Sequence, residues 1–184
     1  MIELIVAIAI MVFILAVILV NYRKFDSGIV MTNLAYDIAL SIRTAQTYGV
    51  STKGTRPESG NQTFETAHGV SFTSPSTSYN LFSDINDDKL LTTGLSLETA
   101  GATTYKLNGS YRISDICSTD GGTETCGRTS VDITFKRPNP DAVIAVGGAY
   151  SATISAVEIH LTSSQDASAE KIITVRPTGQ ISVN

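Results

Sequence analysis

The chain has 184 residues, which suits one domain joined to one hydrophobic segment. Its formal net charge of -4 gives no global reason to expect a nucleic acid or an anionic surface as a partner. Only 16% of the residues are charged, and the sequence after the apolar N-terminal segment is rich in Ser, Thr and Gly. Such a composition is typical of a β domain outside the cytoplasm.

The first predicted element is a helix of membrane length. Seventeen apolar residues run without a break from Leu4 to Val20, and a helix of that length covers about 26 Å, close to the thickness of bilayer hydrocarbon. Glu3 is the exception, because a carboxylate beside hydrocarbon is costly unless it reaches the interface or finds a partner. The run ends in residues 21–24, which are polar and aromatic as at a membrane surface. Without a basic leader or a small-residue cleavage site, an anchor is favoured over a cleaved signal peptide.

A second helical pattern follows directly. Apolar residues recur at three- and four-residue steps, which places them on one helix face: Met31, Leu34, Ala35, Ile38, Ile42 and Ala45. Ser27-Gly28 interrupts the join between the two patterns. It predicts either a mere weak spot or a place where the helix bends or melts, since glycine costs about 1 kcal/mol relative to alanine in a helix. Gly49, Gly54 and Pro57 are expected to end the helix, which at about 50 residues would be about 75 Å long.

After a loop over residues 51–62 the hydrophobic period changes to two. Ten strands are expected, over residues 69–73, 78–82, 90–98, 104–107, 111–117, 130–135, 142–146, 153–162, 171–176 and 179–183. The clearest covers 157–161, where apolar and polar residues alternate as in a half-buried antiparallel strand. The expected fold is α+β, a long helix packed on an antiparallel sheet or sandwich. It divides into a membrane or filament-core helix (1–22), an amphipathic stem (23–50) and a β domain (51–184).

Several segments resemble the type IV pilin and type II secretion pseudopilin family, and most of all the H-type minor pseudopilins and related minor pilins. They are Ile2-Glu3-Leu4 with the apolar run after it, and residues 34–46, 67–72, 79–84 and 172–183. The resemblance implies a filament subunit cut by a leader peptidase and methylated at its new terminal amine. The chain departs from the family, whose glutamate lies two residues further from the mature terminus and whose leader ends in glycine. We therefore expect the natural sequence to begin upstream of Met1.

The resemblance also implies how such a subunit assembles. Helices carrying Ile2, Glu3 and Leu4 would leave the bilayer and pack into a helical core with other copies or related pilin subunits, aided by inner-membrane assembly machinery. Glu3 would pair with the terminal amine of a neighbour, because an unpaired charge in that dry core costs several kcal/mol. The domain would lie outside the cytoplasm, on a single-pass protein of the inner membrane that enters a periplasmic or surface filament. Arg23 and Lys24 oppose this topology by the positive-inside rule, and a basic leader would remove the conflict.

The two cysteines, Cys117 and Cys126, enclose a short polar segment. An even count in a domain outside the cytoplasm favours a disulfide, which would contribute about 2.5–3 kcal/mol on the chain-entropy account. The alternative is a pair of free thiols or of metal ligands, although no histidine or third cysteine lies nearby in the sequence.

Asp84, Asn86 and Asp88 place oxygen atoms at alternate positions, as at the start of a calcium loop. Lys89 stands where such a loop needs glycine, and no glutamate falls at the closing position. A solvated Asx-rich turn is therefore favoured, with calcium as the alternative. No other cofactor is expected.

The sequence offers little support for catalysis. No serine-hydrolase elbow, phosphate-binding glycine loop or zinc signature is present. His160 lies two residues from Glu158 on the polar face of its strand, so an exposed sheet face explains both. We expect a protein that is not an enzyme. Two other functions stay open: a monomeric, membrane-anchored binding domain, and a minor pilin for DNA uptake, which the acidic charge balance does not favour.

Overall fold

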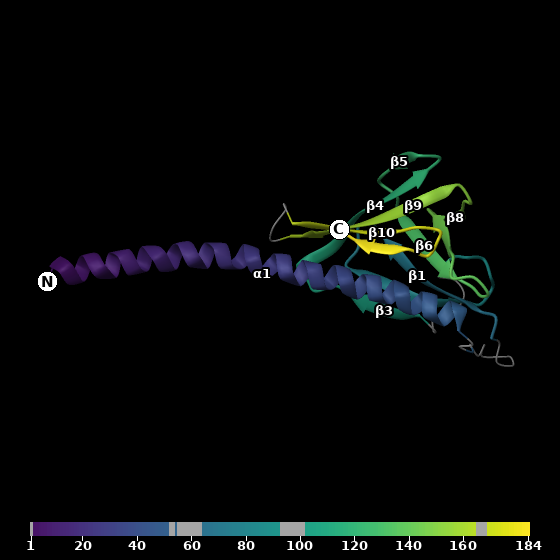
Figure 1. The fold of residues 1–184 in the computed structure, drawn as a ribbon, viewed down its shortest axis with the longest axis horizontal. Helices are drawn as coiled ribbons and strands as arrows, with labels where there is room; N and C mark the ends of the chain where they lie inside the picture. Colours follow the sequence, from purple (N-terminus) through teal and green to yellow (C-terminus); the bar gives the residue numbers. More distant parts are fainter. Residues whose placement is uncertain (1, 52–53, 55–63, 93–101, 165–168) are drawn as a thin grey trace.

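The chain forms one long helix and two antiparallel sheets, so the α+β prediction is confirmed at this level (Figure 1). The computed structural model describes residues 2–51, 54, 64–92, 102–164 and 169–184, apart from the side chains of 20–27. Helix α1 (Ile2–Val50) has 49 residues. Its first half extends away from the strands, and its second half lies along them (Figure 1).

Helix α1 runs through Ser27-Gly28 without a break, so the helix does not melt there. The Thr32 hydroxyl donates a hydrogen bond of 2.8 Å to the Gly28 carbonyl. A Cβ added at Gly28 would meet no atom within 4 Å. Packing within the described chain therefore does not require glycine there. The helix ends at Val50, close to the predicted position.

The strands form a six-stranded sheet in the order β3-β2-β1-β6-β7-β8 and a five-stranded sheet in the order β11-β10-β9-β4-β5. The first contains β1 (Ala67–Thr73), β2 (Ser78–Asp84), β3 (Thr103–Lys106), β6 (Ser130–Phe135), β7 (Ala142–Val146) and β8 (Ala149–Tyr150). The second contains β4 (Tyr111–Asp120), β5 (Thr123–Thr125), β9 (Ile154–Ser163), β10 (Glu170–Val175) and β11 (Ile181–Val183). All neighbouring pairs are antiparallel.

Three details differ from the sequence predictions. Strands β5 and β8 were not expected, because both are short, exposed edge strands without an alternating pattern. The strand predicted over 90–98 is wrong at 90–92, which belong to no strand, and its remainder lies outside the described residues. The last strand begins at Ile181 and not at Gly179, because Gly179 has a φ of +77° in the turn before it.

The second half of α1 packs against the apolar faces of both sheets. Its buried face consists of Met31, Ala35, Ile38, Ile42 and Ala45, each at most 1% exposed. These residues join a single core with inward-facing residues of the strands, among them Val70, Ile133 and Val157. Leu34 is only partly buried at its margin. Burying one isoleucine contributes about 1.5–3 kcal/mol, so this face holds the helix on the domain.

Polar contacts fix the end of the helix. The amide nitrogen of buried Gln46 donates to the carbonyl oxygens of Pro140 at 2.9 Å and Gly179 at 3.3 Å. A Cβ added at Gly49 would overlap the backbone of Phe135, so glycine allows the helix to touch strand β6 there. These contacts tie α1 to loops of both sheets.

Candidate functional site

The most unusual surface of the molecule is the first half of α1. From Ile2 to Leu19 its large apolar side chains are 47–76% exposed, and none of this span is buried within the structure. Its mean hydropathy is 3.2, and it is the one helix among the described residues that is long and apolar enough to cross a membrane. A continuous apolar surface of this size marks a contact with a membrane or with another protein. The segment can therefore act as a membrane anchor or a signal sequence.

The predicted assembly residues, Ile2, Glu3 and Leu4, lie together in the first turn of α1, and all three are exposed. A carboxylate in the first turn of a helix lies near the free backbone N–H groups, which favour negative charge. The position of Glu3 is thus favourable at the end of an isolated helix. It leaves the carboxylate accessible to a cationic group of another molecule.

A second apolar feature, not predicted from the sequence, lies on the stem. Ile29, Tyr36 and Leu40 are exposed and recur at steps of seven and four residues. They lie about half a turn of helix away from the buried face around Ile38. The spacing of these three residues was visible in the sequence, but the more numerous apolar residues of the buried face made it hard to recognise. These three residues give the stem a second, smaller apolar surface on the side away from its buried face.

The structure joins Cys117 and Cys126 in a disulfide. Cys117 lies on β4 and Cys126 follows β5, so the bond closes the hairpin that these strands form. The carboxylate of Asp115 lies within 4.8 Å of both sulfur atoms. The two sulfur atoms are bonded to each other and offer no thiolate to a metal.

The loop proposed for calcium is a network of backbone hydrogen bonds. Asp84 is buried, and its carboxylate accepts from the amides of Asp88 at 3.2 Å and Lys89 at 2.9 Å. Asp88 loses some solvation, but bonds from Thr92, Leu90 and Asn86 outweigh this effect and lower its pKa below the ordinary value. These contacts are typical of an Asx-rich turn. Calcium at Asp84, Asn86 and Asp88 stays a prediction.

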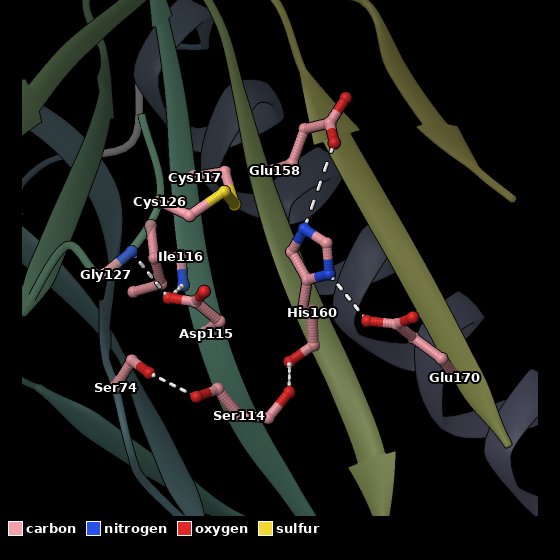
Figure 2. Close-up of polar contacts among 10 residues, drawn as sticks. All are labelled: Ser74, Ser114, Asp115, Ile116, Cys117, Cys126, Gly127, Glu158, His160 and Glu170. Carbon is pink, nitrogen blue, oxygen red and sulfur yellow. Dashed lines mark hydrogen bonds and ion pairs between the residues drawn. A yellow bond between two sulfur atoms is a disulfide. The ribbon is translucent and has the colours of Figure 1, made fainter. Parts of the chain in front are cut away.

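A cluster of ionisable groups lies on the outer face of the five-stranded sheet (Figure 2). Nδ1 of His160 lies 2.7 Å from Oε1 of Glu170, and Nε2 lies 3.9 Å from Oε2 of Glu158. Glu158 and His160 share a face of β9, as their spacing predicted. The contact with Glu170 was missed, because only the pairing of β9 with β10 brings that residue alongside. The His160 side chain is 17% exposed, less than an open sheet face predicts.

Asp115 lies beside His160 across the pairing of β4 and β9. Its carboxylate accepts hydrogen bonds from the amides of Ile116 at 2.7 Å and Gly127 at 2.9 Å (Figure 2). These bonds hold the segment around Cys126 against β4. Asp115 therefore stabilises the hairpin and adds negative charge beside the histidine.

The fold and the exposed helix together define an α+β protein with one N-terminal apolar helix that the domain does not cover. Comparisons of this chain with protein-family models, with curated proteins and with solved structures find no match.

Proposed function

We propose that this chain is a structural subunit of a type IV pilus-like or type II secretion filament. The observation that carries the proposal is the division of α1 into an exposed apolar half and a half buried on the domain. A membrane anchor holds the subunit before assembly, and other copies or related subunits cover the same surface afterwards. The domain then faces water on the outside of the filament.

Head-to-tail contacts between such helices do not close, so they extend as a fibre. When the apolar half of α1 leaves the bilayer it loses its contacts with lipid, and contacts with neighbouring helices replace them. The exposed Glu3 carboxylate pairs with the terminal ammonium group of a neighbour. Because an unpaired charge in that core is costly, the pair favours the correct register between subunits.

A second candidate is a membrane-anchored domain that acts as a monomer. It is supported by the same apolar span, which passes the length and composition test for a membrane helix without any need of neighbours. The two functions differ at Glu3. A plain anchor gains from the loss of this carboxylate, whereas a filament subunit depends on it.

The test is Glu3→Leu, expressed in the native host. Insertion into the membrane should persist, since the change removes a cost of at most about 2.5–3.5 kcal/mol. Incorporation into sheared filaments should fall at least about tenfold, because removing one partner of a buried pair costs on the order of 3–5 kcal/mol. Leu4→Ile is the matched control, since it keeps the apolar volume and should change neither quantity. Normal incorporation of the Glu3→Leu protein would disprove the paired-charge mechanism and favour the anchored monomer.

A further inference from the structure

We propose that the outer face of the five-stranded sheet binds a divalent first-row transition-metal cation, of which Zn²⁺ is the probe, between Nε2 of His160 and the carboxylate of Glu158. The proposal is independent of the filament function. It rests on the geometry around the imidazole ring, whose two nitrogen atoms have different surroundings (Figure 2).

The contact with Glu170 determines which nitrogen can bind a metal. A carboxylate accepts hydrogen bonds, so the 2.7 Å contact places a proton on Nδ1 of His160. In the neutral ring the lone pair then lies on Nε2, and the ring is held in one orientation. Histidine ligands in metal sites commonly donate their other N–H to a carboxylate in this way, which also makes the ligand more basic.

Nε2 is the nitrogen that lacks a partner. It is buried, and no hydrogen bond to it exists among the described residues. Among the described residues the nearest anionic atom is Oε2 of Glu158, at 3.9 Å, which is too far for a hydrogen bond. An imidazole lone pair and a carboxylate oxygen thus face each other across a gap, an arrangement that a cation between them would stabilise. Buried polar atoms in folded proteins are normally satisfied, so this pair requires an explanation.

The gap fits a metal ion of small radius. Zinc lies about 2.0–2.1 Å from histidine nitrogen and about 2.0–2.2 Å from carboxylate oxygen. The separation of 3.9 Å is therefore slightly less than the sum of the two bond lengths. A tetrahedral angle requires the two ligand atoms to approach by about 0.5 Å, which the 29% exposed side chain of Glu158 allows. Water completes the coordination on the solvent side.

The donor set selects the class of metal. Calcium and magnesium prefer oxygen ligands alone, whereas imidazole nitrogen suits zinc, copper and nickel. The neighbouring Asp115 adds negative charge to the same face. The two cysteines form a disulfide and offer no thiolate to the metal. His160 and Glu158 are therefore the two protein ligands, and we expect the bound metal to exchange readily.

The test uses the full chain in detergent micelles, with Zn²⁺ titrated by calorimetry and the two histidines followed by NMR of their imidazole nitrogens. Binding should be saturable, and the Nε2 signal of His160 should shift. The signals of His68, the other histidine, which is buried on β1 in the six-stranded sheet, should stay in place. His160→Asn and Glu158→Gln should each weaken Zn²⁺ binding at least about tenfold. Glu170→Ala keeps both ligands but removes the oxygen that accepts from Nδ1, and it should weaken Zn²⁺ binding about 10- to 100-fold, as loss of an orienting partner does.

The matched control is Glu65→Gln, which removes an exposed carboxylate next to the other sheet and should leave Zn²⁺ affinity unchanged. Ca²⁺ and Mg²⁺ at equal concentration should not displace Zn²⁺ from His160. The absence of a saturable shift at His160, an undiminished affinity in Glu158→Gln, or displacement by Ca²⁺ would each overturn the proposal. If His160→Asn unfolds by circular dichroism, the Glu170→Ala result decides, because that variant retains the ring.

Discussion

The two halves of α1 are built from similar apolar residues and have opposite surroundings. Ile8 is 53% exposed, whereas Ile38 is fully buried. The stem has polar residues between its apolar ones, so one face can meet the sheets while the other meets water. The first half is apolar on every side from Leu4 onward, and no described part of the domain packs against it. Among the described residues nothing covers this half, so lipid or another protein is the partner that its exposed apolar surface suits.

The difference between the two halves is tested most directly by removing the first half of the helix. A chain that begins at Ile29 should be a soluble, folded monomer, because it keeps the buried face of the stem and loses the exposed span. Its circular dichroism should show both helix and strand. Its thermal midpoint should not change with protein concentration, as measured over a hundredfold range. A strong dependence on concentration would show that the domain associates by itself.

Single substitutions should separate the two halves by their effect on the free energy of unfolding. Ile38→Ala should lower it by about 2–5 kcal/mol, because it leaves a cavity in a packed core. Ile8→Ala, the same change in the exposed half, should alter it by less than about 0.5 kcal/mol. Denaturant unfolding of the full chain in detergent, followed by a probe in the domain, measures both. Equal losses from the two changes would mean that the first half also contributes to the fold.

Burial in the domain also changes the pKa of a charged group, and its effect on stability should be smaller than that of the apolar substitutions. Burial raises the pKa of Asp132 on β6 above its ordinary value of 3.8. Hydrogen bonds from Ser71 and from the Leu91 amide oppose the rise, and the charge of Asp88 adds to it. The folded state therefore holds this proton more tightly than the unfolded state does. That contribution to stability is present below pH 3.8 and is lost as the pH rises through the pKa of the folded state.

Asp132→Asn keeps a neutral side chain of the same shape at every pH. At pH 7 it should raise the free energy of unfolding, by less than about 1.5 kcal/mol, the scale of one side-chain hydrogen bond. Below pH 3.8 the parent carboxyl is protonated too, so the difference should vanish. Urea unfolding at several pH values tests both statements. A destabilised variant at pH 7 would show that the hydrogen bonds of the carboxylate outweigh its burial.

Much of the local structure could be predicted, because it depends on periodicity along the chain. The residues predicted to face the core of the stem are buried, with Leu34 at the margin, and β6 and β7 have the predicted bounds. The membrane-length helix followed from an unbroken apolar run. Strands β5 and β8 could not be predicted, since short exposed edges carry no alternation and exist only where a neighbouring strand offers hydrogen bonds.

The sequence alone determined that one segment is too apolar to remain in water and that another has a face for packing, because hydrophobic burial depends on residue type and spacing. It did not determine which distant groups meet. The contact of His160 with Glu170 depends on the register of β9 with β10. The burial of Asp132 depends on β6 lying between β1 and β7. Only the tertiary structure decides such meetings, because strand order and register are properties of the whole fold.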